Sequence, residues 1–311
     1  MRVIALLNRN SGASAANVGE SPELQVADAL AAAGLDAEVR CVAGDQLDDE
    51  AKAAAAAGVD AVIAGGGDGT ISTVAAALAG GDTPLGVLSM GTLNHFAKDL
   101  GIPFDLAAAA KIIAANNPRR IDLARVNDKI FVNNSSLGAY ARALIDRDAT
   151  RSRLRLSKWP AMALAALKTF RRGALINVRL DVEGTIYRLK TPLIFVGNNR
   201  YRLDLLKVGA RDRLDAGVLS LYVARVHSRW GMLKLILNGA LGRLEQDRDF
   251  ETLYPREVWM ETRRTRLHVA ADGEVMRMNA PLHYEIMPQA LSVFVPETNS
   301  NAKGLRTLRA K

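Results

Sequence analysis

A glycine run between an apolar segment and a helix-forming segment constrains this chain more than any other feature. Ala61–Ala64 is a short apolar run, residues 65–70 read GGGDGT, and Ile71–Leu78 has the composition of a helix. Glycine tolerates positive φ and lets a ligand approach the backbone closely, so amides converge at the partially positive start of a helix. The run predicts a strand–turn–helix unit that holds phosphate. The residues expected to do so are Gly65, Gly66, Gly67, Asp68, Gly69 and Thr70.

Two side chains of the run add detail to this prediction. Thr70 is expected to supply a capping hydroxyl at the start of the helix. Asp68 can lie beside phosphates only with a bound Mg²⁺ or with a hydrogen-bonding role, because two anions otherwise repel one another. The alternative is a tight turn that binds no ligand.

The flanking sequence extends the unit to an α/β domain. Apolar runs of strand length alternate with helices of about ten residues through the first 120 positions. Continuous apolar strands separated by helices are typical of a parallel sheet covered on both faces. We therefore expect a Rossmann-like, doubly wound α/β domain over residues 1–122. The expected strands are 3–7, 37–42, 61–64 and 85–88, and the expected helices are 22–33, 47–57, 71–78 and 106–115.

The pattern changes in the second half of the chain. Val178, Leu180 and Val182 alternate with polar residues, which is typical of an antiparallel sheet with one buried face. We expect a β-rich, β-sandwich-like second domain over residues 123–295, interrupted by helices at about 153–171 and 229–244. The polar tail 296–311 is expected to be partly disordered or to pack back on the first domain.

Composition narrows the class of protein. The chain has 311 residues, of which 49% are hydrophobic and 24% charged, as in packed globular proteins. Its single cysteine, Cys41, excludes an intrachain disulfide and favours a reducing compartment, the cytoplasm. No apolar stretch reaches the roughly 18 residues that a spanning helix requires. Residues 1–120 carry 8 basic and 14 acidic residues, and residues 121–311 carry 33 and 19, so the second half is expected to face an anionic partner.

The segment 151–172 is the candidate contact with that partner. It holds seven Lys or Arg and no acid around an apolar centre with Trp159. This composition predicts an amphipathic helix at an anionic membrane surface, which would place the protein peripherally on the inner face of the membrane. The alternative is a solvated basic face over a buried apolar stripe. Nucleic acid is not expected as a partner, because interleaved exposed aromatics and a known binding module are missing from the sequence.

Two common phosphate-binding patterns do not fit the glycine run. No GxxxxGK[ST] occurs in the chain, which excludes a P-loop enzyme. The dinucleotide pattern GxGxxG fails because Thr70 stands where its last small residue belongs.

Several motifs in order along the chain resemble the diacylglycerol kinase catalytic-domain family, which includes bacterial lipid kinases and the sphingosine and ceramide kinases. The resemblance covers nearly the whole chain and implies an α/β nucleotide domain followed by a β-rich lipid-substrate domain. The matching segments are Asn8–Gly12 (NRNSG), Ala64–Val74 (AGGGDGTISTV), Gly91–Pro103 (GTLNHFAKDLGIP), Phe131–Gly138 (FVNNSSLG) and Asp272–Glu274 (DGE).

The resemblance implies that the γ-phosphoryl group of ATP is transferred, with Mg²⁺, to a lipid hydroxyl such as that of diacylglycerol. The Asp68 carboxylate would bind the Mg²⁺ ion or order the glycine-rich loop. Thr92 and Asn94 follow the next parallel strand, and Asn8 and Ser11 follow the first strand, so all four are expected at the same carboxyl edge of the sheet. Capping of their own loops is the alternative role for Thr92 and Asn8.

The second catalytic motif lies near the other end of the chain. The resemblance makes Glu274 the general base that takes the hydroxyl proton, with Asp272 helping through metal or loop geometry. The alternative for an Asp-Gly-Glu sequence is an ordinary hairpin turn with solvated acids.

The chain departs from the family pattern at two positions. The family commonly has Asp before the glycine of a segment resembling 213–219, where it helps to hold a structural magnesium ion. Here that position is Ala216, and Asp215 precedes it, so Asp215 is the candidate metal ligand. His95 stands where many members carry an acid after the asparagine of the second loop, and imidazole is a poor ligand for Mg²⁺.

Two other functions compete with the lipid kinase. A NAD kinase would share the GGGDGT loop, but it leaves the 272–274 match and the basic segment 151–172 unexplained. A nucleotide-binding membrane adaptor without transferase activity is favoured by Ala216 and His95. Asp68 and Glu274 argue against the adaptor.

Overall fold

A computed structural model describes most of the chain. The described residues are 1–9, 21–138, 141, 175–201, 211, 213–226, 228, 231, 234, 238 and 246–297. The predicted helix at 153–171, most of the one at 229–244 and most of the tail 296–311 lie outside this set.

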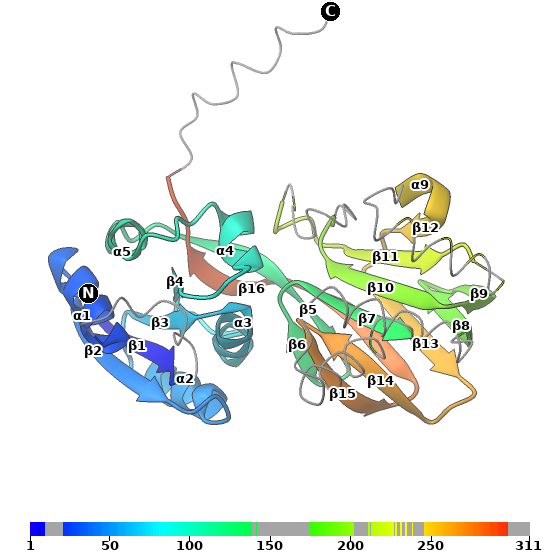
Figure 1. Ribbon diagram of the computed structural model, residues 1–311, viewed down its shortest axis with the longest axis horizontal. Helices are drawn as coiled ribbons and strands as arrows, with labels where there is room; N and C mark the ends of the chain where they lie inside the picture. The colour runs from blue at the N-terminus through cyan, green and yellow to red at the C-terminus, as the bar shows by residue number, and fades with distance from the viewer. Residues whose placement is uncertain are drawn as a thin grey trace, which may run out of the picture.

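The first part of the chain folds as predicted into a parallel sheet with helices on both faces (Figure 1). The strand order is β2-β1-β3-β4, and every neighbouring pair is parallel. Helix α1 packs against α5 and α2 packs against α3, so the sheet is doubly wound. The strands are β1 (Arg2–Asn8), β2 (Asp36–Val42), β3 (Ala61–Gly66) and β4 (Leu85–Ser89), and the helices are α1 (Pro22–Ala32), α2 (Leu47–Ala56), α3 (Asp68–Ala77), α4 (His95–Leu100) and α5 (Leu106–Ala114).

Local sequence explains where these elements begin and why they pack. The Ser21 hydroxyl accepts a hydrogen bond from the Leu24 amide at 3.3 Å and caps α1, and Asp105 caps α5 through the Ala108 amide at 2.8 Å. All six residues of β3 are buried, which accounts for its continuous apolar sequence.

The second part is β-rich and antiparallel, as predicted. A six-stranded sheet, in the order β12-β11-β10-β7-β14-β15, faces a second sheet whose outer strands are β13, β8 and β9. The strands are β5 (Pro118–Val126), β6 (Lys129–Phe131), β7 (Asn134–Gly138), β8 (Ile176–Val182), β9 (Thr185–Thr191), β10 (Leu193–Asn198), β11 (Leu219–Ala224), β12 (Phe250–Leu253), β13 (Glu257–Thr262), β14 (Arg266–Ala271), β15 (Glu274–Asn279) and β16 (Leu282–Phe294), and the short helix is α9 (Gln246–Asp249).

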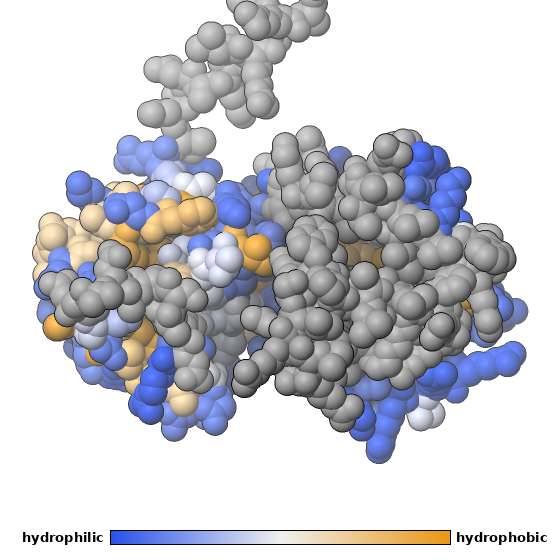
Figure 2. Space-filling view, viewed as in Figure 1, coloured by the Kyte–Doolittle hydropathy of each residue, from blue (hydrophilic) through white to orange (hydrophobic). Residues whose placement is uncertain are grey.

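Alternation along the strands builds the sandwich core. Val178 and Leu180 of β8 are buried between outward-facing neighbours, as the sequence pattern requires. They share one apolar cluster with Ile194 and Val196 of β10 in the opposite sheet. The two sheets therefore enclose a common core. Outside this core, Figure 2 shows hydrophilic residues along the lower rim of this half, near β14 and β15.

The long strand β16 joins the two halves of the molecule. Its beginning pairs with β13 in the β-rich half, and Val293 near its end pairs in parallel with Leu85 of β4. Tyr284 is buried in the second core, whereas Leu291 and Phe294 are buried in the first. Strand β5 runs antiparallel beside β16 over most of its length (Figure 1). The division into domains 1–122 and 123–295 stays a proposal, because β16 contributes to both cores.

No helix within the described ranges is long and apolar enough to span a bilayer.

Candidate functional site

The glycine turn lies at the carboxyl end of β3 and leads directly into α3. The cap of α3 is Gly67, so the prediction that Thr70 caps the helix is wrong. The helix begins three residues earlier than expected, so Asp68, Gly69 and Thr70 belong to its first turn. Thr70 is buried, and its hydroxyl accepts a hydrogen bond from Asn8 Nδ2 at 3.4 Å. The first turn of α3 therefore has no side-chain cap, and its amides point towards the turn.

Close contacts require glycine at two positions of the two loops, Gly66 and Gly91. A Cβ atom on Gly91 would lie 2.6 Å from the Cα of Gly67, and one on Gly66 would lie 2.7 Å from the hydroxyl of Thr70. The Met90 amide also donates to the Gly66 carbonyl at 2.9 Å. The glycine turn and the loop after β4 thus pack backbone to backbone.

Asp68 links the glycine turn to the start of α4. Its Oδ1 accepts a hydrogen bond from the Phe96 amide at 3.4 Å. Asn94 adopts φ 50° and is 4% exposed; its side chain accepts from the Gly91 amide at 3.2 Å and donates to the Gly91 carbonyl at 2.9 Å. Asn94 therefore shapes the second loop, whereas Thr92 of the same loop is exposed to solvent.

Asp272 joins the β-rich half to helix α3. Its carboxylate accepts the backbone amides of residues 132, 133 and 134 at 2.7, 2.8 and 3.1 Å. It also accepts the hydroxyl of Ser72. Ser72 lies four residues after Asp68 on α3, so the two side chains share one face of the helix. Asp272 is therefore held by four donors, three from residues 132–134 and one from α3.

Glu274 follows Asp272 at the end of the hairpin between β14 and β15. Asp272 and Gly273 have φ values of 48° and 87°, which makes the motif a two-residue hairpin turn. The Glu274 side chain is 61% exposed, and its Oε2 lies 3.6 Å from Lys129 Nζ. The hairpin alternative thus describes the backbone correctly, but only Glu274 of the two acids is solvated.

A second contact between the halves was not predicted from the sequence. Arg211 Nε donates to Asp99 Oδ2 of α4 at 2.7 Å, with side-chain exposures of 0% and 3%. The guanidinium also donates to the Val132 carbonyl at 2.7 Å and to Asn133 Oδ1 at 3.0 Å. Burial raises the pKa of Asp99, and Arg211 opposes that rise. The pair holds the helix that follows the second loop against the β-rich half.

The residues around the candidate metal ligand Asp215 offer a poor site for a divalent ion. Asp215 forms an ion pair with Arg213 at 2.9 Å, and the hydrogen bond from Arg213 lowers the pKa of Asp215. The nearby Asp122 is 1% exposed, and its carboxylate accepts the amides of Gly217 at 2.7 Å and Gln289 at 2.8 Å. Within the described part of the chain, no three His, Cys, Asp or Glu side chains cluster as metal ligands. Asp68, beside the glycine turn, suits a metal bound together with phosphate better than Asp215 does.

Two predicted elements of the site, Ser11 and the basic segment 151–172, lie outside the described residues. The structure adds Ser72, Asp99, Asp122 and Arg211 to the residues that shape the site. The four-residue spacing between Asp68 and Ser72 could have indicated that Ser72 shares the face of Asp68. The pairing of Asp99 with Arg211, 112 positions apart, has no local signal.

Comparison with known proteins agrees with this architecture. Residues 2–126 match the family model of the diacylglycerol kinase catalytic domain, and residues 134–295 match the YegS C-terminal NAD kinase beta sandwich-like domain. The chain therefore belongs to the diacylglycerol kinase-like family, within its YegS-like lipid kinases, as the motif resemblance implied.

Individual relatives extend over most of the chain. A Pseudomonas fluorescens protein named "Probable lipid kinase YegS-like" is 30% identical over 289 residues, which cover 90% of this chain and 92% of the relative. A Mycobacterium tuberculosis protein named "Diacylglycerol kinase" is 32% identical over 272 residues, covering 83% and 84% of the two chains. The crystal structure of a diacylglycerol kinase from Bacillus anthracis superposes with a TM-score of 0.68 at 20% identity, covering 95% and 97%, and shows the shared fold.

Proposed function

We propose that this kinase-family chain transfers the γ-phosphoryl group of ATP to the hydroxyl of a membrane lipid such as diacylglycerol, in a reaction of phospholipid biosynthesis. One observation carries the proposal. The Asp272 carboxylate binds Ser72 of α3, so the hairpin that carries Glu274 lies on the helix that begins at the glycine turn. An acid from the β-rich half thereby comes near the place where phosphates would bind.

The nucleotide is proposed to bind along the carboxyl edge of the parallel sheet. Amides of residues 65–70 would hold the phosphates, because the first turn of α3 has no side-chain cap. Asp68 would bind Mg²⁺ together with phosphate oxygens, and the exposed Thr92 would contact the nucleotide. Asn8, which reaches Thr70, and Asn94, which shapes the second loop, would act mainly by fixing these loops. Ser11 is proposed to join them from the first loop.

Glu274 is the proposed general base. Its carboxylate would accept the proton of the lipid hydroxyl while the hydroxyl oxygen bonds to the γ-phosphorus and the bond to the β-phosphate bridging oxygen breaks. Bound Mg²⁺ would neutralise charge on the phosphates. Four donors occupy the carboxylate of Asp272, so Asp272 would position the hairpin and leave proton transfer to Glu274. Lys129 would restrain the Glu274 side chain before substrate enters.

The lipid acceptor requires contact with a membrane. We propose that the segment 151–172 lies on the anionic inner leaflet and that the protein is a peripheral protein on the cytoplasmic side. Its seven basic residues and apolar centre support this placement.

Transfer of labelled phosphate tests the function directly. The full chain is incubated with γ-labelled ATP, Mg²⁺ and, in separate reactions, diacylglycerol, ceramide, a sphingoid base, NAD or water. Label in a lipid is expected. Label in NAD alone would favour the NAD kinase, the second candidate because of the NAD kinase-like sandwich that residues 134–295 match. ATP binding without transfer to any acceptor would favour the adaptor.

A further inference from the structure

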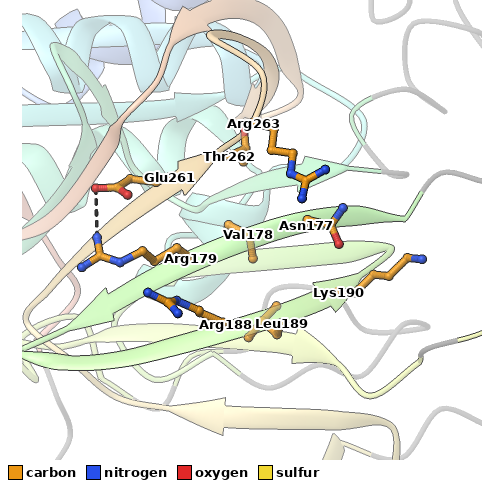
Figure 3. Close-up of a pocket in the computed structure, with 9 residues that line it drawn as sticks. All are labelled: Asn177, Val178, Arg179, Arg188, Leu189, Lys190, Glu261, Thr262 and Arg263. Carbon is orange, nitrogen blue, oxygen red and sulfur yellow. Dashed lines mark ion pairs between the residues drawn. The ribbon is translucent and has the colours of Figure 1, made fainter.

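The outward face of strands β8, β9 and β13 carries an open hollow of about 520 Å³ with several basic side chains in its lining (Figure 3). Four of its nine lining residues are cationic and one, Glu261, is acidic. The hollow lies in the β-rich half, on strands that contribute no residue to the candidate kinase site. The four cations are Arg179, Arg188, Lys190 and Arg263.

The strand register concentrates positive charge at this hollow. Arg179 and Arg188 are directly opposite one another on β8 and β9, and like charges in such a pair destabilise a sheet. Glu261 lies opposite Arg179 on the other side and binds it at 3.0 Å. Lys190 and Arg263 are the other two cations of the lining. The hollow thus holds four cations and one carboxylate. An anion from outside the protein would offset the excess of positive charge.

Apolar side chains stand beside the cations on the same face. Ile186 of β9 and Trp259 of β13 are paired with Asp181 of β8, one on each side. These three residues lie two positions along their strands from Arg188, Arg179 and Glu261, on the same face of the sheet. Their exposures are 51% and 40%, whereas the alternate residues Val258 and Met260 of β13 are buried and those of β9 are partly buried against the core. Exposed tryptophan and isoleucine next to arginines suit the headgroup region of a bilayer. There the indole ring lies among phosphates and glycerol, and the arginines lie near the phosphates.

We propose that this face, defined by Asn177, Arg179, Asp181, Ile186, Arg188, Lys190, Trp259, Glu261 and Arg263 and called the basic sheet face, docks on an anionic phospholipid bilayer. The hollow takes the headgroup phosphates, and Ile186 and Trp259 enter the interface. The basic sheet face does not include the segment 151–172, and the inference does not depend on phosphoryl transfer. Charge complementarity and the adjoining apolar pair select a bilayer over a soluble anion, which would gain nothing from Ile186 and Trp259.

Vesicle sedimentation with the full chain tests the proposal. Binding to phosphatidylcholine vesicles with 30–40% phosphatidylglycerol, roughly the level that gives a strongly negative surface, is compared with binding to pure phosphatidylcholine. Arg188→Gln with Arg263→Gln should weaken binding to the anionic vesicles about 30-fold, which corresponds to roughly 2 kcal/mol. The matched control is Lys111→Gln with Arg119→Gln, which removes the same charge from exposed positions of the first half. Equal losses in both variants would overturn the proposal.

A second measurement does not depend on charge. Brominated anionic lipids should quench tryptophan emission in the unaltered protein, and Trp259→Phe should remove a large share of that quenching while the protein still sediments with vesicles. Unchanged quenching in Trp259→Phe would contradict the placement of this face in the interface. Binding of short DNA or inorganic phosphate to the same arginines, without vesicle binding, would also overturn the proposal. Lipid phosphorylation of detergent-dispersed substrate is expected to survive in Arg188→Gln, so failure of this inference and failure of the kinase function are distinguishable.

Discussion

Arg211 and Asp99 form a buried ion pair between the two halves of the molecule, with Nε and Oδ2 2.7 Å apart. Asp99 belongs to α4, directly after the second loop, and Arg211 belongs to the β-rich half. The same guanidinium binds Val132 and Asn133, whose amides bind Asp272. The ion pair and the Asp272 contacts therefore both use the connection between β6 and β7. Through this connection, α4 after the second loop and the hairpin between β14 and β15 are held together.

Removal of one partner of this pair should destabilise the protein strongly. Arg211→Met leaves the Asp99 carboxylate buried without its cation, and such losses typically amount to about 3–5 kcal/mol. Urea unfolding followed by circular dichroism measures the free energy of unfolding. The matched control is Arg213→Met, whose partner Asp215 is half exposed, and it should change stability little. Similar effects of the two substitutions would show that the Asp99–Arg211 pair does not join the halves.

The Ser72–Asp272 contact should affect transfer more than folding. Ser72→Ala removes one of four donors to Asp272, so we expect a stability loss of about 1 kcal/mol. Because this donor is the one from α3, kcat should fall while the Kd for ATP changes little. Rescue by Ser72→Thr, which restores the hydroxyl, separates hydrogen bonding from side-chain volume. Full activity in Ser72→Ala would mean that the hairpin is positioned without α3.

The close approach of the two glycine loops makes Gly91 intolerant of a side chain. Gly91→Ala places a Cβ atom 2.6 Å from the Cα of Gly67, so the loops must separate, at a cost of roughly 1–3 kcal/mol. ATP binding measured by calorimetry should weaken with it. Gly69→Ala is the matched control, because a Cβ atom at that position would meet no neighbouring group within 4 Å, and its thermal midpoint should not fall. A stable Gly91→Ala that binds ATP normally would contradict this packing.

Cys41 should react slowly with thiol reagents in the folded protein. Burial, followed by the hydrogen bond with Glu23, raises the pKa of Cys41 to about 11. The thiolate is the reactive form, so at pH 8 only about one molecule in a thousand carries it, and the rate should rise roughly tenfold for each pH unit up to that pKa. Reaction with a chromogenic disulfide, with and without urea, measures this. Equal rates in folded and unfolded protein would contradict the shift.

Periodicity and turn chemistry predicted much of the fold. The predicted runs located β1 to β4 within one or two residues. The buried parallel strands β1, β3 and β4 have continuous apolar sequences with no polar face to obscure them. Alternation in β8 indicated the antiparallel half. The role of β16 was not predictable, because its first residues pack in one core and its last residues in the other, and a local pattern carries no information on which sheet a strand joins.

The candidate site was predicted in its parts but not in its connections. The glycine turn and the Asp-Gly-Glu motif could be found as local sequence, since each is a contiguous motif of a few residues. Asp99–Arg211 and Ser72–Asp272 bring together residues 112 and 200 positions apart. Such contacts depend on the position of one half relative to the other. The packing of β5 against β16 determines that position. The capping role expected for Thr70 was wrong because the helix begins at Asp68, so Gly67 is its cap and Thr70 lies inside its first turn.

Phosphoryl transfer by Glu274→Gln tests the central claim most directly, namely that a carboxylate of the β-rich half meets triphosphate held by the α/β half. Transfer of labelled phosphate to lipid and ATP binding are measured on the same preparation. The account predicts a fall in kcat of about 10²- to 10⁴-fold with an unchanged Kd for ATP, because the substitution keeps the side chain's size and removes its basicity. Turnover equal to that of the unaltered protein would contradict it.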